Sequence, residues 1–362
     1  MLLGVDASRA ALDRRTGTEA YSLHLIRAML AQTTHHVRLF FNQHPPKEMF
    51  PASTAEHREL PSRRLWTHYR LARELSRNPV DWLFVPSHIL PLLFSGKAAV
   101  TVHDLGFRHF PEAHRLTDRM YLDLMTRRSI SRADVVFADS NATREDLVLD
   151  YRVPDSKIVV AYPGYDESLT RTTDDEIARA RDKYGLAEDY ILYLGTLQPR
   201  KNILRLIDAW EMLPIDQQPQ LALAGGLGWL ASGIKARVSD FNQSQIALLG
   251  YIPEEDKAAL LSGAIAFAFP SLYEGFGFPV LEAMACGTPV VCSDSSSLPE
   301  VANSAALMVD PLDTKAISNS LLQLIENYEL RNRLIGEGYR NLQRFSWVNC
   351  AAVILNAIEE NK

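Results

Sequence analysis

The stretch that decides the fold covers residues 264–292 and reads AIAFAFPSLYEGFGFPVLEAMACGTPVVC. It opens with an apolar run that indicates a buried parallel strand, and a proline and two glycines then predict a loop at the carboxyl end of that strand. Pro279 suits the first turn of a following helix, and Gly287 suits its end. A second apolar run closes the stretch. The stretch therefore predicts a strand, a helix and another strand, which is the repeating unit of a parallel α/β sheet.

The same alternation of apolar strands and amphipathic helices extends over most of the chain. It predicts two doubly wound, Rossmann-like α/β domains, joined by the polar segment 166–189. We place the first domain at residues 1–166 and the second at 167–345. Strands are expected in the first at 2–5, 37–41, 82–85, 98–102, 135–138 and 158–161, and in the second from 190 onward and at 221–224, 246–249, 265–269 and 289–292.

Composition and charge limit the class of protein. The 362 residues are 47% hydrophobic, which is enough for two cores. Residues 1–165 hold 22 Lys and Arg against 18 Asp and Glu, a net charge of +4, whereas the remainder holds 16 against 26, a net charge of −10. An acidic total and the lack of a recognised motif argue against nucleic acid binding. Because no apolar run reaches 18 residues and the N-terminus lacks a basic, cleavable start, we expect a cytoplasmic protein.

Two glutamates of the quoted stretch are candidates for ligand binding. Glu274 lies in the predicted loop, and Glu282 lies in or just beyond the first turn of the helix. Eight residues of continuous helix would separate them by about 12 Å, so the loop must fold back if both face one ligand, and Gly275 and Gly277 permit this. The N–H groups of residues 278–281 would then hold a phosphate between two polyols. The alternative is a capped helix with solvated acidic residues.

A second candidate cluster follows the strand that begins at Tyr190. Residues 199–202, Pro-Arg-Lys-Asn, lie between this strand and an amphipathic helix, so Arg200 and Lys201 are expected at a strand-to-helix turn. Paired cations beside helix N–H groups can hold a diphosphate. A solvated basic loop is the alternative interpretation. The three cysteines show no metal or disulfide spacing, and we expect buried thiols at Cys286, Cys292 and Cys350.

In their order and spacing these motifs resemble the family-4 retaining glycosyltransferases of GT-B architecture. The Glu-x7-Glu element of that family is matched by Glu274 and Glu282, its Pro-Arg-Lys-Asn element is matched by residues 199–202, and the likeness covers nearly the whole chain. The resemblance implies two doubly wound domains that face each other across a cleft, with the last helix, at 346–362, crossing back onto the first. Supporting pieces are Thr101–Leu105, Ala138–Ser140, Pro163–Asp166, Gly225–Gly226 and Leu248–Pro253.

The resemblance also implies roles for single residues. Glu282 would bind the nucleotide ribose, Glu274 would orient the donor sugar, and Arg200 and Lys201 would hold the diphosphate. His103 follows a strand of the first domain and would contact the donor sugar, with a structural hydrogen-bonding role as the alternative. The other residues expected at the donor are Gly17 in the loop after the first strand, Tyr251, Gly275, Phe276, Gly277, Phe278, Val280 and Leu281. The alternative for the Gly17 loop is a structural role, with Thr18 as the N-cap of the following helix.

The implied reaction is a retaining, front-face transfer of a hexose from a nucleotide sugar, in which the leaving phosphate helps to deprotonate the acceptor. No nucleophile with an adjacent base is evident in the sequence. We expect neither a metal site nor a cofactor, because the chain has no Asp-x-Asp pair and Arg200 with Lys201 can supply the positive charge. One departure is Thr196, which stands where many relatives have an arginine after the strand glycine.

The identity of the donor is predicted from the resemblance alone. Mannose from GDP-mannose is the leading prediction, because His103–Leu105 and residues 195–202 are similar to mannosyltransferases of surface-polysaccharide pathways. UDP-, ADP- and dTDP-sugars stay open as donors. A GT-B epimerase or phosphorylase, or a non-catalytic sugar-nucleotide-binding subunit, also stays open.

The acceptor, a glycan or a lipid-linked glycan, is expected on the basic first domain. Residues 57–77 predict a helix with Leu65, Tyr69, Ala72 and Leu75 on one stripe, and such a basic helix suits an anionic membrane or a lipid diphosphate. The arginines around the stripe are Arg63, Arg64, Arg70, Arg73 and Arg77, and Arg127, Arg128 and Arg132 form a second basic stretch. A packed stripe with a solvated basic face is the alternative, so peripheral contact with the inner membrane face stays open.

Overall fold

The computed structural model describes residues 1–12, 17–46, 49–51, 53–62, 65–113 and 115–361. The chain divides into two compact units. The first holds Met1–Arg108, Leu116–Gly164 and Phe345–Lys362, and the second holds His109–Arg115 and Tyr165–Arg344. The grouping of the segment 109–115 with the second unit was not indicated by the sequence. Among the described helices, none combines the length and the apolar character that crossing a bilayer requires.

The first unit is built on a parallel sheet with the strand order β3-β2-β1-β4-β5-β6-β7. Its strands are β1 (Leu2–Asp6), β2 (His36–Phe41), β3 (Glu56–Glu59), β4 (Trp82–Val85), β5 (Lys97–Val102), β6 (Val135–Ala138) and β7 (Ile158–Val160). All but β3 were predicted to within one or two residues, because strands covered on both faces are short, continuous apolar runs.

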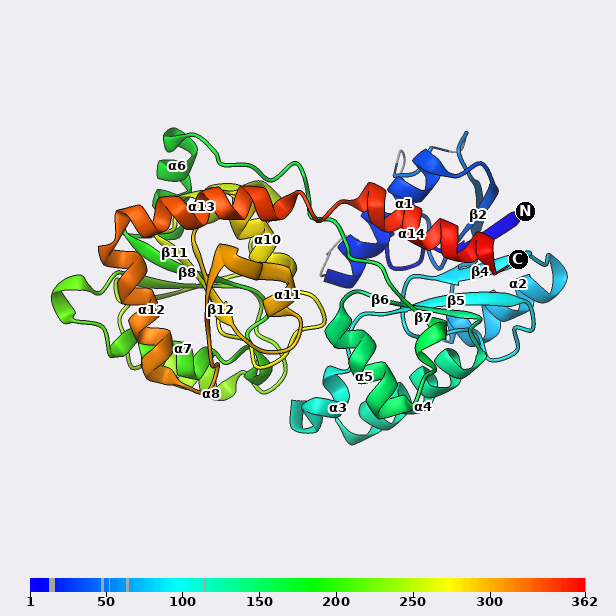
Figure 1. The fold of residues 1–362 in the computed structure, drawn as a ribbon, viewed down its shortest axis with the longest axis horizontal. Coiled ribbons are helices and arrows are strands. Elements are labelled where there is room, and N and C mark those ends of the chain that lie inside the picture. The colour runs from blue at the N-terminus through cyan, green and yellow to red at the C-terminus, as the bar shows by residue number, and fades with distance from the viewer. Residues whose placement is uncertain (13–16, 47–48, 52, 63–64, 114, 362) are drawn as a thin grey trace. The chain divides into compact units, whose positions relative to one another are not determined.

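Helices cover both faces of this sheet (Figure 1). On one face α1 (Gly17–Gln32) packs against α14 (Trp347–Glu360). On the other face α2 (Ala72–Arg77), α4 (Leu116–Arg132) and α5 (Asn141–Tyr151) bury side chains in one core with the strands. The short helix α3 (Gly106–His109) follows β5. The predicted doubly wound arrangement is therefore present.

The last helix joins the first unit although most of the chain separates it from α1. The Ser346 hydroxyl caps α14 by accepting from the Val348 N–H at 3.1 Å. Cys350 and Ile354 recur at a spacing of four and are buried, so one stripe of the helix faces inward. Gly164 lies so close to the start of this helix that a Cβ there would collide with the backbone nitrogen of Trp347. The helix α14 is thus an integral part of the first unit.

The second unit contains a parallel sheet with the strand order β10-β9-β8-β11-β12-β13. Its strands are β8 (Tyr190–Leu194), β9 (Gln220–Ala224), β10 (Ile246–Gly250), β11 (Ala266–Phe269), β12 (Val290–Ser293) and β13 (Ala306–Val309), the last of which was not predicted. Its helices are α6 (Asp174–Tyr184), α7 (Ile203–Glu211), α8 (Ser232–Val238), α9 (Glu254–Gly263), α10 (Phe278–Ala285), α11 (Leu298–Ala302), α12 (Thr314–Glu326) and α13 (Tyr328–Leu342).

Each sheet reverses its strand order once, and the reversal decides where a ligand fits. In the first unit the order turns between β1 and β4, and in the second it turns between β8 and β11. An open parallel sheet binds its ligands beyond the carboxyl ends of the two strands at such a point. In the second unit the loop after β8 carries Arg200 and Lys201, and the loop after β11 carries Glu274. The topology therefore brings the predicted residues of the second unit to one edge of its sheet.

The predicted basic helix at 57–77 is wrong in its first half. Glu56–Glu59 pair with β2 as the edge strand β3, and a π-helix, η1 (Trp66–Leu71), begins only after Pro61 and continues into α2. The strand escaped prediction because its four residues are all polar, which a central strand would not tolerate. Of the predicted stripe, Ala72 and Leu75 are buried, whereas the two residues before them are exposed. Arg63 and Arg64 lie outside the described residues.

Candidate functional site

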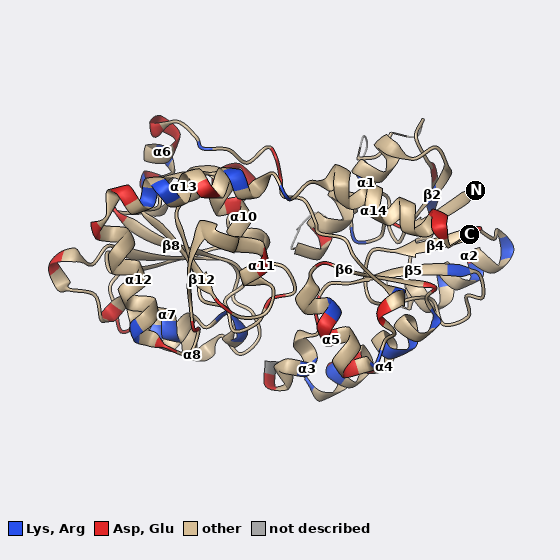
Figure 2. Ribbon diagram, viewed as in Figure 1, with Lys and Arg blue, Asp and Glu red and all other residues tan. Residues whose placement is uncertain are grey.

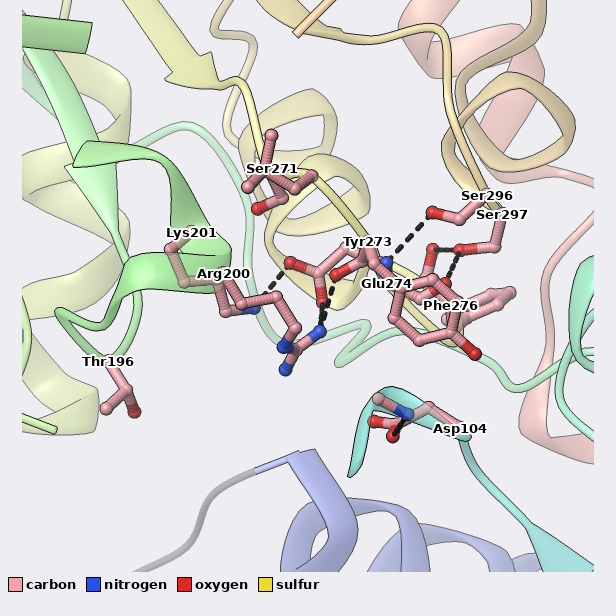
Figure 3. A network of polar contacts seen from close by, with 12 residues as sticks. Asp104, Thr196, Arg200, Lys201, Ser271, Tyr273, Glu274, Phe276, Ser296 and Ser297 are labelled. Carbon is pink, nitrogen blue, oxygen red and sulfur yellow. Dashed lines mark hydrogen bonds and ion pairs between the residues drawn. The ribbon is translucent and has the colours of Figure 1, made fainter. Parts of the chain in front are cut away.

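The centre of the candidate site is the Glu274 carboxylate, which two cations of a neighbouring loop hold (Figure 3). Lys201 Nζ lies 2.5 Å from Glu274 Oε1, and Arg200 Nη1 lies 3.3 Å from Oε2. Arg200 Nη1 also donates to the Tyr273 carbonyl at 2.5 Å. All three charged side chains are largely buried. The two strand-to-helix turns that the sequence singled out therefore meet, and Glu274 is the point of contact.

The loop after β8 is fixed by an asparagine. Asn202 ends a single 3₁₀ turn, Pro199–Lys201, with a left-handed backbone (φ 61°) and begins α7. Its Nδ2 donates to the carbonyls of Pro270 at 3.0 Å and Pro311 at 2.7 Å. The Arg200 carbonyl accepts from the Leu272 N–H at 2.9 Å. These bonds tie the loop to the segment that carries Glu274, so both cations are held by backbone geometry as well as by charge.

The loop after β11 is held by two serines from beyond β12. Ser296 Oγ accepts from the Glu274 N–H at 2.8 Å, and Ser297 Oγ donates to the carbonyls of Glu274 at 3.0 Å and Phe276 at 2.5 Å. Gly277, with φ 126°, then turns the chain into α10, and this backbone region is open only to glycine at low cost. The predicted donor residues Gly275, Phe278, Val280 and Leu281 belong to this loop and to the first turn of α10, whose dipole is positive at that end.

The charges of the site keep Glu274 ionised. Burial alone would raise the pKa of the Glu274 carboxyl, but the charges of Lys201 and Arg200 outweigh burial and hold that pKa below its ordinary value. The carboxylate is therefore an anion at neutral pH and cannot serve as a general acid. With two cations and one anion, the cluster carries one net positive charge, which favours an additional anion.

Glu282 lies in α10 and has a different partner. Lys257 Nζ of α9 is 3.1 Å from Glu282 Oε1 and 2.9 Å from Glu254 Oε2. Burial raises the pKa of the Glu282 carboxyl, although Lys257 opposes the shift. The two glutamates of the Glu-x7-Glu element thus belong to two separate ion clusters, one at each end of the loop and helix that connect them.

In the first unit the predicted residue His103 lies directly after β5. Its Nδ1 is 2.7 Å from Asp139 Oδ2, its Nε2 is 3.2 Å from the Pro86 carbonyl, and its backbone N–H donates to His88 Nε2 at 3.0 Å. Burial would lower the pKa of His103, but the charge and hydrogen bond of Asp139, the hydrogen bond to the Pro86 carbonyl and the charge of Asp104 together outweigh burial and raise it. Burial lowers the pKa of His88 to about 4, so this ring stays neutral and accepts.

The remaining predicted residues are scattered. Gly17 is the first residue of α1 and is exposed, and Tyr251 after β10 is also exposed. Residues 13–16 of the loop after β1, with Arg14, Arg15 and Thr16, lie outside the described residues. The three cysteines are buried free thiols, as predicted. Over the described part of the chain, no group of three or more His, Cys, Asp or Glu side chains could hold a metal ion.

The sequence did not single out Lys257, Asp139 or His88. Lys257 lies at a helix start among three acidic residues and carried no signal of its own, since its link to Glu282 exists only in the folded sheet. Asp139 was part of a motif that supported the resemblance, but no role was given to it. A buried aspartate directly after an apolar strand was the signal available, because an unpaired carboxylate would be costly there.

Comparison with known proteins agrees with these features. The family model described as Glycosyl transferases group 1 matches residues 175–341, and the model described as Glycosyltransferase Family 4 matches residues 15–169. The O-antigen chain mannosyltransferase B of Escherichia coli is 35% identical over 265 residues, which are 72% of this chain and 70% of that protein. The O-antigen chain mannosyltransferase RfbU of Salmonella typhimurium is 27% identical over 276 residues, which are 76% of this chain and 72% of that protein.

Solved structures share the fold. A sucrose-phosphate synthase from Thermosynechococcus elongatus matches with a TM-score of 0.78 at 22% identity, over 99% of this chain and 98% of that one. Because two glycosyltransferase models span the two parallel-sheet units and a transferase is 35% identical over most of its own length, the chain belongs to the family-4, group-1 glycosyltransferases and has their GT-B, Rossmann-like fold.

Proposed function

We propose that the protein is a retaining mannosyltransferase that moves mannose from GDP-mannose to a glycan or a lipid-linked glycan and needs no metal ion. The observation that carries the proposal is the cluster of Arg200, Lys201 and Glu274 at the strand reversal of the second sheet. A guanidinium has five N–H donors and an ammonium three, so this pair of cations has the capacity to bind the carboxylate and a diphosphate together.

The same residues stabilise the leaving diphosphate. As the bond between the sugar and the diphosphate breaks, negative charge builds on the phosphate, and Lys201, Arg200 and the positive end of α10 stabilise it by preorganised electrostatics. These groups do what a divalent cation does in other nucleotide-dependent enzymes. Turnover is therefore expected to persist in EDTA, and a loss of turnover that magnesium or manganese restores would contradict this part of the proposal.

Glu274 acts on the sugar. Its ionised carboxylate accepts hydrogen bonds from sugar hydroxyls and stabilises the positive charge of the oxocarbenium-like ring. The acceptor oxygen then forms its bond on the face from which the diphosphate leaves, and the proton of the acceptor hydroxyl passes to the departing phosphate oxygen. The anomeric configuration is retained. Glu282 is assigned to the ribose and His103 to the donor sugar.

The donor is inferred from the relatives. Two mannosyltransferases of O-antigen chains are similar over most of this chain, which favours mannose as the sugar and GDP as the carrier. We place the protein in the cytoplasm, peripheral to the inner membrane face, where it would meet a lipid-linked acceptor. The donor needs no further cofactor.

A thermal-shift screen followed by turnover tests the proposal. A ligand at 100 times its Kd stabilises the folded protein by about 2.7 kcal/mol, so GDP-mannose should raise the Tm more than UDP-, ADP- or dTDP-sugars do. Free GDP should then appear only when an acceptor is present, and NMR should show the donor's anomeric configuration in the product. Release of GDP without an acceptor, or an inverted product, would contradict transfer with retention.

A further inference from the structure

The helix α4 carries large apolar side chains on its outer face. Leu116, Met120 and Leu124 recur at every fourth position and are 61%, 63% and 59% exposed, and Tyr121 beside them is 47% exposed. The buried side of α4 is formed by Met125, Thr126, Ser129 and Ile130, and Ile130 packs in the core of the first unit. A surface helix ordinarily turns polar residues to water. More than half of each side chain in this row is left uncovered, and exposed apolar surface of this kind marks interaction sites.

The apolar row continues onto η1. His68 Nε2 and Tyr121 Oη are 3.0 Å apart and their rings meet edge to face, which places η1 against α4. Beside this contact Leu65 and Tyr69 are 72% and 60% exposed. We call the exposed apolar side chains of these two elements the α4–η1 face: Leu65, Tyr69, Leu116, Met120, Tyr121 and Leu124.

The helices α2 and α4 carry basic residues, which Figure 2 shows in blue along the ribbon. Arg73 lies in α2 directly after η1 and is exposed. Arg119 and Arg128 lie on α4 itself. Arg128 Nη2 donates to the Leu92 carbonyl at 3.1 Å, which holds this guanidinium beside the helix. The border of the apolar face is therefore positively charged.

The acidic residues of α4 do not cancel this charge on the face. Asp123 Oδ1 is 2.7 Å from Arg108 Nη1 and is thus paired. Asp118 leaves the helix on the side opposite to Met120, since successive residues turn by about 100°, but it lies one turn before Tyr121 and so contributes one negative charge at the margin of the face. The α4–η1 face thus combines apolar side chains with cations at its rim.

We propose that the first unit docks on an anionic lipid surface through the α4–η1 face. Apolar side chains that enter the headgroup boundary, with arginines around them, are the combination that interfacial helices use on anionic lipids. A second copy of the chain fits the face less well, because a symmetric contact would bring two positively charged borders together.

The position of α4 relative to the sheet links this docking to the candidate site of the first unit. The chain passes from β5 through α4 to the parallel strand β6, so α4 begins at the carboxyl edge of the sheet, where His103 lies. Leu116 and Met120 are at that end of the helix. Docking would hold the carboxyl edge of the first sheet at the membrane surface. In this respect the inference rests on the proposed function, since it names the membrane as the place where a lipid-linked acceptor is met.

Vesicle co-sedimentation without donor or acceptor tests the docking. The parent protein should bind vesicles of mixed phosphatidylcholine and phosphatidylglycerol and should bind phosphatidylcholine alone much less, with binding that weakens as salt is added. The double variant Met120→Gln/Leu124→Gln should bind the mixed vesicles at least about ten-fold less, because two apolar side chains no longer enter the lipid. The double variant Arg73→Gln/Arg119→Gln should lose about 25-fold, at roughly five-fold for each arginine.

Matched controls lie in the second unit. Ile215→Gln and Arg179→Gln replace an exposed apolar and an exposed basic residue there, and both should bind vesicles like the parent. Turnover with a water-soluble acceptor should be unchanged in all variants, which verifies their folding. If turnover is absent while vesicle binding follows this pattern, the proposed function fails and the docking stands.

Three outcomes would overturn the docking. The first is a parent protein that does not bind the mixed vesicles. The second is equal vesicle binding by the parent and both double variants. The third is a concentration-dependent dimer of the parent, without vesicle binding, that Met120→Gln/Leu124→Gln abolishes, since the α4–η1 face would then be a contact between copies of this chain.

Discussion

The carboxyl edges of the two sheets carry buried ion clusters of different kinds. In the second unit Glu274 is held by Arg200 and Lys201, so one positive charge is left over, and the pKa of the carboxyl is lowered. In the first unit His103 is held by one carboxylate, that of Asp139, so no cation is left over, and the pKa of the histidine is raised. Both clusters follow apolar parallel strands in sheets of the same topology.

The difference shows that the fold determines where a site lies, whereas the local charges determine which ligand group it can bind. An edge with an excess cation is prepared for a diphosphate before any ligand arrives. An edge where one carboxylate faces one histidine has no excess cation and attracts no anion strongly, but it holds an imidazole in a fixed orientation. The same architecture thus accommodates phosphate recognition in one unit and a polar contact in the other.

Glu274→Gln should give the largest effect, because it removes the negative charge of the carboxylate and keeps the shape of the site. We expect kcat to fall by about 100- to 1000-fold, while GDP binds as well as before or more tightly, since a nearby anion is gone. Steady-state kinetics and isothermal titration check the two quantities. Weaker GDP binding would place Glu274 at the nucleotide instead of at the sugar.

Lys201→Ala should weaken the binding of GDP and of the donor by about ten- to 100-fold, because a charge-assisted contact to phosphate is lost. It should also lower the free energy of unfolding, since the buried Glu274 loses one of its two cations. Arg200→Ala should act in the same direction. The exposed Lys235→Ala is the control for loss of one positive charge in this unit. Unchanged GDP affinity in both site variants would mean that the excess positive charge of the second unit does not bind the diphosphate.

Glu282→Ala should weaken GDP binding by about ten-fold and leave turnover at saturating donor nearly unchanged, because this carboxylate is assigned to the ribose. Glu274→Gln should lower turnover and spare GDP binding, whereas Glu282→Ala should do the reverse, since the two side chains belong to separate clusters. Titration of GDP and a donor saturation curve test this. If the two variants change GDP affinity and turnover in the same way, the two clusters act as one functional unit.

Asp139→Asn should have the smallest effect and should appear as a change in pH dependence. The folded-state pKa of His103 is raised above 6.5, so the stabilisation that protonated His103 gains from Asp139 is fully present below pH 6.5 and is lost as the pH rises through the folded-state value. A tenfold gain in proton affinity on folding corresponds to about 1.4 kcal/mol. The groups that face His103 are Asp139, Asp104, His88, Tyr21 and, through His88, Arg9.

Denaturant unfolding between pH 6 and 9, a window that brackets the ordinary histidine pKa of about 6.5, checks the pH dependence. The parent should lose stability as the pH rises, and Asp139→Asn should show a flatter profile over the same range. Equal slopes in the two proteins would mean that Asp139 does not raise the pKa of His103, which would contradict the account of the first unit.

The sequence determined the elements that follow from local chemistry. Continuous apolar runs specified the central strands, Pro279 and Gly287 specified the limits of α10, and the motifs after β8 and β11 specified which loops matter. The polar edge strand β3 and the outer row of α4 escaped prediction. A polar strand has no apolar period, and an apolar row on a helix looks the same whether it faces a core or solvent.

Only the tertiary structure decided which charges meet. Lys201 and Glu274 are 73 residues apart, and Lys257 and Glu282 lie on different helices, yet each pair is in contact. The sequence alone suggested that both glutamates face one ligand, with Arg200 and Lys201 left for its phosphates. Because the strand order places β8 beside β11, the loops after these strands meet, and the buried Glu274 carboxylate is then compensated by Lys201 and Arg200, with one positive charge left over. Spacing along the chain cannot report that contact, since it depends on which strands become neighbours in the sheet.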